Sequence, residues 1–358
     1  MSTKRKRNPN QLQPANPANK TTWRKFARVL AHVIATTDTN DERARAEARK
    51  LHRNYSIANG GGANPYQITD GTEIAKTSHN PTDAGALVRA ALGVALIVQS
   101  VTYMASARRC GLINACPHST PLCRLACLGH TSGRLVMDNS QRAQIIRTRF
   151  MIEHPREWWL VLTGEARNHA TRAQERGGAW LYRPNGATEF KFDQVPGYAE
   201  GIRAMAPDPS SVYFQDYAKR DAAERAKNLT PQFWHLAPSA SERTRTADQY
   251  EPYMAVAVDI APRRGNTPAE PLPHTFMGRP VIDGDASATD PTKPLGHGDM
   301  RLLDPITHPV TDPALAPLIL LRAKGDVAQA QQIGPQYFVK NARHLVPELV
   351  TADALATA

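Results

Sequence analysis

The stretch REWWLVLTGEARNHATRAQERGGAWLYR, residues 156–183, joins a helical pattern directly to a strand pattern. Its first part, 156–176, repeats apolar residues every three or four positions, which predicts one buried face of a helix. The apolar stripe consists of Trp159, Leu162, Ala166, Ala170 and Ala173. Two glycines precede AWLYR (179–183), an aromatic and aliphatic run that favours a buried strand. A helix followed at once by a strand predicts a βα unit of a parallel sheet.

Similar strand patterns recur along the chain. They lie at 211–217, 233–237, 253–260, 279–283 and 317–323, and the apolar run at 91–105 predicts an earlier buried strand. Open doubly wound sheets and (β/α) barrels both use such units. No glycine-rich dinucleotide fingerprint follows any of these strands, and polar residues stand just past several strand ends. We therefore expect an α/β fold, a partial or closed (β/α) barrel of parallel strands, with a basic helical N-terminal extension.

The polar residues after the strands are candidate catalytic residues, because the carboxyl ends of barrel strands share one rim where active sites are built. The candidates are Asn185, Glu189, Lys219, Ser239, Glu242, Asp283, Asp285 and Lys324. The same residue types also form turns and helix N-caps, and Asp283-Gly284-Asp285 suits a turn. For any one of these residues, both interpretations remain open.

Charge divides the chain into parts. Residues 1–53 hold thirteen Lys and Arg against four Asp and Glu, which is nine of the eleven net positive charges. We expect a disordered basic tail at 1–20, then a basic amphipathic helix and a Gly-rich connector over 21–65. The barrel-like domain is expected at 66–345, with a cysteine cluster at 110–127, and a C-terminal tail at 346–358. The basic arm is predicted to attract polyanions such as DNA, and a solubilising tail is the alternative.

The predicted compartment is the cytoplasm. The first twenty residues are charged and polar, unlike a signal peptide. The apolar run at 91–105 is shorter than the roughly 20 residues that span a bilayer, so no membrane association is expected. A reducing compartment disfavours structural disulfides.

All four cysteines of the chain follow one another as C-x5-C-x6-C-x3-C, from Cys110 through Cys116 and Cys123 to Cys127. The C-x2-C knuckle typical of structural zinc sites is absent. A helical turn would place Cys123 and Cys127 on one face, and with Cys116 they could hold three corners of a [4Fe-4S] cluster. Cys110 is a possible fourth ligand. Zinc, with His118 or His130, and unligated thiols are the alternatives.

A cluster loop after the first strand of a partial barrel resembles the layout of radical S-adenosylmethionine enzymes. The usual spacing there is C-x3-C-x2-C, from which this chain departs. The resemblance implies a [4Fe-4S] cluster with S-adenosylmethionine, and Asn185, Gly186 and Thr188 as residues that bind this cofactor.

Several pieces between about 110 and 340 resemble, in this order, the gene product 88-like family of bacteriophage proteins. They are CPHSTPLCRLACLG (116–129), QRAQIIRTRF (141–150), RPNGATEF (183–190), YFQDYAK (213–219), WHLAPSASE (234–242), RPVIDGD (279–285), DMRLLDP (299–305) and LLRAKG (320–325). The chain has Asn-Gly-Ala-Thr-Glu at 185–189 where that family typically has Asn-Gly-Thr-Ser-Asp, and it has a longer segment at 286–298. The resemblance implies a phage protein in the host cytoplasm that acts on nucleic acid or a nucleotide.

Three functions remain open at this point. The first is an iron-sulfur, radical S-adenosylmethionine-like enzyme that modifies nucleic acid or a nucleotide. The second is a non-radical barrel enzyme, such as a nucleobase transglycosylase modifying DNA, with structural zinc and with Asp283 or Asp285 as nucleophile or base. The third is a non-enzymatic, DNA-binding phage regulator that uses the 1–53 arm.

Overall fold

The computed structural model describes residues 12–74, 91–120, 123–124, 127, 129, 133–219, 222, 225, 233–240, 244, 249–259, 272–284, 301–322 and 339–340. The α-helices are α1 (Trp23–Thr36), α2 (Glu42–Ala58), α6 (Asp138–Glu153), α7 (Pro155–Gln174), α8 (Tyr198–Arg203) and α10 (Asp304–Thr307). The strands are β1 (Thr69–Ile74), β2 (Ile97–Val101), β3 (Ala179–Arg183), β4 (Val212–Ala218), β5 (Trp234–Pro238), β6 (Ala255–Asp259), β7 (Thr275–Phe276), β8 (Arg279–Asp283), β9 (Leu318–Arg322) and β10 (Val339–Lys340).

The described strands form two five-stranded sheets, in the orders β1-β2-β3-β4-β5 and β10-β6-β9-β8-β7. The strands β2 to β5 run parallel, as do β10, β6, β9 and β8, whereas β1 and β7 are antiparallel to their single neighbours. A parallel bridge between Ser239 and Ala255 joins the end of β5 to the start of β6. The carboxyl ends of β2 to β5 therefore meet at one edge of the first sheet, which we call the carboxyl edge.

The predicted strands at 179–183, 211–217, 233–237, 253–260, 279–283 and 317–323 are confirmed, as β3, β4, β5, β6, β8 and β9. The fold is therefore mixed α/β with largely parallel sheets. The curled sheet corresponds to a half-barrel. The closed barrel that was one alternative is not formed by the described strands. The antiparallel strands β1 and β7 lie at the outer edges, and neither has a second described neighbour.

Each face of the first sheet has its own cover. Trp180, Tyr182, Phe214 and Trp234 point to the face covered by α7 and α8, and Phe214 stacks on Trp234 with ring centroids 4.7 Å apart. On the opposite face, Leu181 packs with Leu303 of the short 301–307 segment. Side chains alternate between faces along a strand, so β3 and β4 contribute to both layers.

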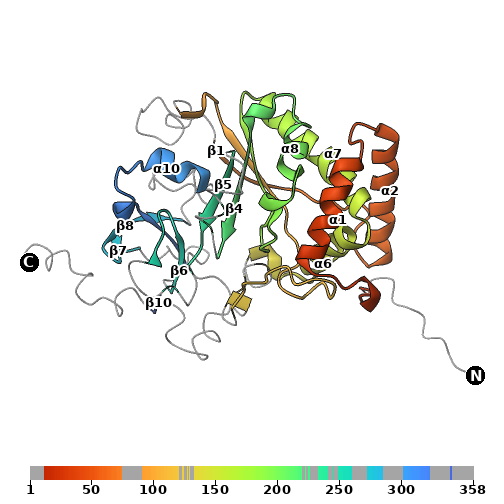
Figure 1. The fold of residues 1–358 in the computed structure, drawn as a ribbon, viewed down its shortest axis with the longest axis horizontal. Coiled ribbons are helices and arrows are strands. Elements are labelled where there is room, and N and C mark those ends of the chain that lie inside the picture. The colour runs from red at the N-terminus through yellow and green to blue at the C-terminus, as the bar shows by residue number, and fades with distance from the viewer. Residues whose placement is uncertain are drawn as a thin grey trace, which may run out of the picture.

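The basic N-terminal helices are part of the main core, which corrects the expectation of a helical extension. Two helices replace the single one expected, because Asp41 caps a new helix by accepting a hydrogen bond from the backbone N–H of Ala44 at 2.9 Å. Phe26 and Leu30 of α1 are buried in the same cluster as α7. Figure 1 shows α1 and α2 beside α6 and α7, on the opposite side of the strands from α10.

No helix within the described ranges is both long enough and apolar enough to cross a membrane.

Candidate functional site

The cysteines lie on the segment that follows β2 at the carboxyl edge. The segment is tied to α6 at two points. The backbone N–H of Ala105 donates to Oγ1 of Thr148 at 2.8 Å, and Nε of Arg149 donates to the carbonyl of Cys110 at 2.8 Å. These contacts fix the first part of the segment, up to Cys110, to α6.

Cys116 closes this loop back on its start. The backbone N–H of Ala107 donates to Sγ of Cys116 at 3.3 Å, while the carbonyl of Ala107 accepts from Ala115 at 2.7 Å. Ala107 adopts a positive φ of 49°, which turns the chain at this point. A thiol sulfur that accepts a backbone N–H is already oriented with its lone pairs toward a defined donor.

Cys123 and Cys127 continue the segment. Thr120 accepts a hydrogen bond from the backbone N–H of Cys123 at 3.2 Å, as an N-cap residue does, and Cys123 is helical whereas Cys127 is not. A Cβ built on Gly129 would lie 3.5 Å from Sγ of Cys127 and 2.6 Å from Cβ of Ala187. Cys127 therefore lies close to the segment that follows β3.

Two residues from neighbouring strand ends complete a group that we call the cysteine site: Cys116, Cys123, Cys127, Glu189 and Lys219. Lys219 follows β4, and its ammonium group donates to Sγ of Cys123. Its backbone N–H donates to Oε1 of Glu189 at 3.0 Å, and the N–H of Glu189 donates to the carbonyl of Ala115 at 2.8 Å. The structure thus brings together residues from the ends of β2, β3 and β4.

The electrostatics of the cysteine site reflect this crowding. Burial above all, together with the nearby charges of Cys127, Cys123 and Glu189, raises the pKa of Cys116 to about 12. For Lys219, burial acts to lower the pKa, but the charges of Cys123 and Glu189 outweigh it and raise the pKa above its usual value. Thiols and a carboxylate that oppose one another's ionisation form a site that a cation stabilises.

Glu189 carries an unused acceptor. The residue is 8% exposed, and its Oε2 atom is buried without a hydrogen-bond partner among the residues that the structure describes. A buried carboxylate oxygen without a partner costs free energy, so the arrangement favours a bound donor or cation at this atom.

Cys110 packs in the main core. It is fully buried in the main core, and its thiol donates to the carbonyl of Ile113 at 3.6 Å. Cys110 therefore occupies a packing position in the main core.

The loop that carries Glu189 follows β3 and contains Asn185, Gly186 and Thr188. Nδ2 of Asn185 donates to the carbonyl of Phe190 at 2.7 Å and to Asp216, while its Oδ1 accepts from Oγ1 of Thr188 at 2.6 Å. A Cβ on Gly186 would lie 2.5 Å from Cδ1 of Tyr103, so a glycine is needed at this close approach.

The remaining predicted site residues are dispersed or outside the described residues. Ser239 lies at the carboxyl edge, where its N–H donates to the carbonyl of Ala218 at 2.8 Å, next to Lys219. Asp283 ends β8 in the second sheet. Glu242, Asp285 and Lys324 lie outside the described residues, as do the 1–11 part of the N-terminal tail and the C-terminal tail.

Sequence reasoning missed Asp216 and Arg109. Asp216 lies inside β4, and burial raises its pKa to about 8 although Asn185 donates to it. Arg109 is close to Cys127, and burial lowers its pKa while the charge of Cys127 acts to raise it. A carboxylate within the apolar run YFQDY was the available signal for Asp216, because charged residues are rare inside buried strands.

The donor chemistry of the cysteine site fits a thiolate-bound metal group. Three thiols of low exposure are the ligands that iron-sulfur clusters and zinc prefer. Within the described residues, no three His, Cys, Asp or Glu side chains are already arranged in a metal-ligating geometry. Binding would therefore draw the three sulfurs closer together and release their protons.

Comparison with known proteins gives one match. No curated protein and no solved structure matches the chain. The sequence model of Gene product 88, a family of phage gene products, matches residues 70–301, which include all of β1 but its first residue, the strands β2 to β8 and every residue of the cysteine site. Since this match covers more than half of the sequence, the chain belongs to the Gene product 88 family.

Proposed function

We propose that this protein is an iron-sulfur enzyme of the radical S-adenosylmethionine-like type that acts on nucleic acid or a nucleotide. The observation that carries the proposal is the convergence of Cys116, Cys123 and Cys127 with Glu189 and Lys219 at the carboxyl edge. In folds with parallel strands, this edge is where the active site is built.

In this proposal, the three cysteines of the cysteine site hold a [4Fe-4S] cluster. When bound, such a cluster would supply the electron for reductive cleavage of S-adenosylmethionine. The N–H of Ala107 donates to Cys116 and orients its sulfur. Lys219 provides a positive charge that offsets the negative charge of the thiolates.

Glu189 is the proposed acceptor for the positively charged end of the cofactor, through its unpartnered Oε2. Asn185, Gly186 and Thr188 have a positioning role in this proposal, since their hydrogen bonds and close packing hold the loop that carries Glu189. Ser239, Glu242, Asp283, Asp285 and Lys324 remain candidates for contacts with the substrate.

Anaerobic purification, reconstitution with iron and sulfide, and metal analysis test this proposal. The wild type should bind about four irons per chain and show the broad visible absorption of iron-thiolate bonds. Single Cys116→Ser, Cys123→Ser and Cys127→Ser variants should each lose most of this iron. The Cys110→Ala variant is the matched control and should retain it. Full iron binding by the three Ser variants would contradict the proposal.

Zinc in place of iron would favour the non-radical barrel enzyme. In that outcome the three cysteines are structural ligands, chelation unfolds the protein, and Asp283 or Asp285 becomes the candidate nucleophile or base for modifying DNA.

A specific feature favours nucleic acid as a partner in either outcome. The exposed surfaces of α1 and α2 present basic residues that form no ion pair with a described residue, namely Arg24, Lys25, Arg28, Arg49, Lys50 and Arg53. Clustered basic side chains attract the phosphate backbone through release of counterions. Binding of nucleic acid without any turnover would favour the third candidate, a phage regulator.

A further inference from the structure

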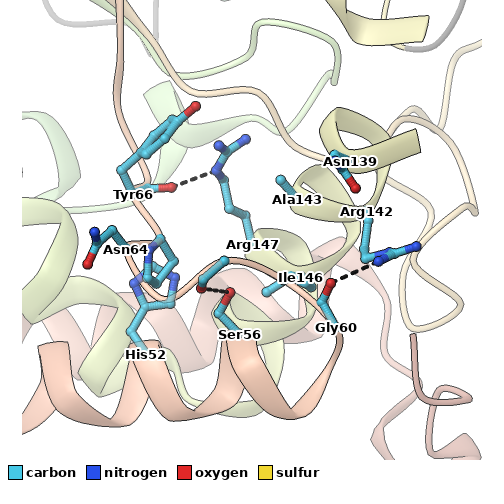
Figure 2. Close-up of a pocket in the computed structure, with 13 residues that line it drawn as sticks. His52, Ser56, Gly60, Asn64, Tyr66, Asn139, Arg142, Ala143, Ile146 and Arg147 are labelled. Atoms are coloured by element: carbon cyan, nitrogen blue, oxygen red, sulfur yellow. Dashed lines mark hydrogen bonds between the residues drawn. The ribbon is translucent and has the colours of Figure 1, made fainter. Parts of the chain in front are cut away.

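A pocket lies between α2, the 60–66 segment and α6 (Figure 2). Its volume is about 650 Å³, within the range of about 300–1,000 Å³ that is typical of small-molecule sites. None of the residues of the cysteine site lines it. The pocket is therefore a separate site, formed by elements that the proposed chemistry does not use.

Arg142 gives the pocket an uncompensated positive charge. Its Nη1 atom donates to the carbonyl of Gly60 at 2.9 Å, and no carboxylate pairs with it in the part of the chain that the structure describes. The residues that line the pocket include no Asp or Glu. Arginine presents several N–H donors in a planar fork that matches a phosphate group.

Two amide side chains add neutral donors to the same wall. Asn64 and Asn139 line the pocket, and their side chains make no hydrogen bond with a described residue. Figure 2 shows Asn139 and Arg142 projecting from neighbouring turns of α6, with Ala143 on the same helix. The wall therefore combines one cation with free amides, a set that suits a phosphate and its ester oxygens.

An aromatic ring stands at the other side of the pocket. The guanidinium carbon of Arg147 lies 4.6 Å from the ring centroid of Tyr66, and Nε of Arg147 donates to the Tyr66 carbonyl at 2.6 Å. Nη1 of Arg147 also donates to the carbonyl of Tyr103 at 3.0 Å, so the guanidinium is held at both ends. Tyr66 is nonetheless 47% exposed. A ring that is fixed on one face and open elsewhere is a platform on which a base stacks.

The glycine segment keeps the pocket open. A Cβ on Gly61 would lie 2.5 Å from Oγ of Ser56 and 2.7 Å from Cδ1 of Ile146, so the backbone there packs directly on the pocket floor. The Ser56 hydroxyl donates to the carbonyl of Gly62 at 2.8 Å. A Cβ on Gly62 would have no atom within 4 Å, which leaves open space beside this residue.

We propose that this pocket binds a nucleotide, with its phosphate at Arg142, Asn64 and Asn139 and its base against Tyr66. The proposal goes beyond the chemistry of the cysteine site and does not depend on which metal that site holds. The nucleotide phosphate has two possible sources, a free mononucleotide or the 5′ end of a single strand.

Calorimetric titration of the full chain tests the proposal, with adenosine 5′-monophosphate and a 5′-phosphorylated thymidine hexanucleotide as probes. Binding of at least one probe should weaken at least tenfold in Arg142→Ala, which removes the charge. It should also weaken in Ala143→Leu, which fills the pocket without changing its charge. Arg43→Ala, an exposed arginine of α2 that lies outside the pocket and pairs with Glu47, is the matched control and should bind as the wild type does. The tighter probe identifies the source of the phosphate.

Three results would overturn the proposal. One is absence of binding of both probes to the wild type, and another is equal binding by the wild type and Arg142→Ala. The third is binding of inorganic phosphate as tight as that of the nucleotide, which removes the role of Tyr66. The titration is repeated in Cys116→Ser, so that loss of the metal group and loss of nucleotide binding are measured separately.

Discussion

The backbone N–H of Lys219 donates a 3.0 Å hydrogen bond to Oε1 of Glu189, and this bond joins the segments that follow β4 and β3. The carboxylate is thereby fixed by one oxygen, while its Oε2 atom is buried and has no described partner. A carboxylate held in this way is pre-organised to accept a hydrogen bond from a positively charged group.

Glu189→Gln tests that role. The amide oxygen can still accept from Lys219, but the negative charge is lost, so binding of S-adenosylmethionine to the reconstituted protein should weaken by about tenfold or more, which corresponds to about 1.5–3 kcal/mol for a charged hydrogen bond. Equilibrium dialysis measures the affinity. The melting temperature of the metal-free variant measures the structural contribution of Glu189, because Lys219 loses a nearby opposite charge. A lower melting temperature with unchanged cofactor affinity would assign Glu189 a structural role only.

Gly186→Ala should destabilise the protein, since the new methyl group would lie 2.5 Å from Tyr103 and 2.7 Å from Cγ1 of Val101. Overpacking of this kind costs about 1–3 kcal/mol of unfolding free energy. Gly62→Ala is the control, because its methyl group would meet nothing within 4 Å. Urea unfolding of both variants measures the difference. Equal unfolding midpoints would show that the contact between Gly186 and Tyr103 relaxes without cost.

Leu30→Ala tests whether α1 belongs to the core. Leu30 is fully buried against the main cluster, and truncation of such a residue costs about 2–5 kcal/mol of unfolding free energy. The preceding residue, Val29, is 48% exposed, so Val29→Ala should change stability by less than about 0.5 kcal/mol. Thermal or urea unfolding compares the two. If Leu30→Ala were as stable as the wild type, α1 would not be held in the core of the protein.

The exposed basic side of α1 should contribute to nucleic-acid binding through charge. Replacing Arg24, Lys25 and Arg28 together by Gln keeps the helix propensity and removes three positive charges. The slope of log affinity against log salt for duplex DNA should become shallower by about 2–3, at about 0.9 per lost phosphate contact. Arg43→Gln is the control, because Arg43 already pairs with Glu47 at 3.1 Å. An unchanged slope would place the nucleic-acid contacts elsewhere.

The sheet strands could be predicted from the sequence because their buried residues form short, continuous apolar runs. The strand β3 coincides with the predicted 179–183, and β8 coincides with 279–283. In contrast, the apolar pattern of the sequence did not predict helix α6. Its buried face includes Gln144, Arg147 and Arg149, and the two arginines donate to backbone carbonyls of distant segments. An apolar periodicity does not detect a helix whose buried face is polar.

The cysteine spacing predicted that Cys116, Cys123 and Cys127 lie close together. It did not predict which other side chains contact them, because these contacts depend on the order of the strands in the sheet. Lys219 is 96 residues from Cys123 along the chain and reaches it because β4 lies two strands from β2. Asp216 shows the same limit. Its partner Asn185 follows β3, and only the parallel pairing of β3 with β4 brings the two together. The residue types were visible in the sequence, whereas their pairing was set by tertiary structure.

Asp216 should make the stability depend on pH. Burial raises its pKa from 3.8 to about 8, so the folded protein retains a proton that the unfolded chain loses. The resulting stabilisation is fully present below about pH 4 and is lost as pH rises through about 8, with a slope of at most about 1.4 kcal/mol per pH unit. Asp216→Asn cannot ionise, so its unfolding free energy should lack this decline. Urea unfolding at pH 5, 6, 7 and 8 compares the two proteins.

The control for this titration is Asp208→Asn. Asp208 is exposed, and hydrogen bonds from Ser210 and Ser211 lower its pKa, so it titrates below the pH range measured. The stability of this variant should decline with pH as that of the wild type does. Parallel pH profiles for wild type and Asp216→Asn would contradict the prediction, because they would mean that Asp216 is ionised in the folded protein throughout this range.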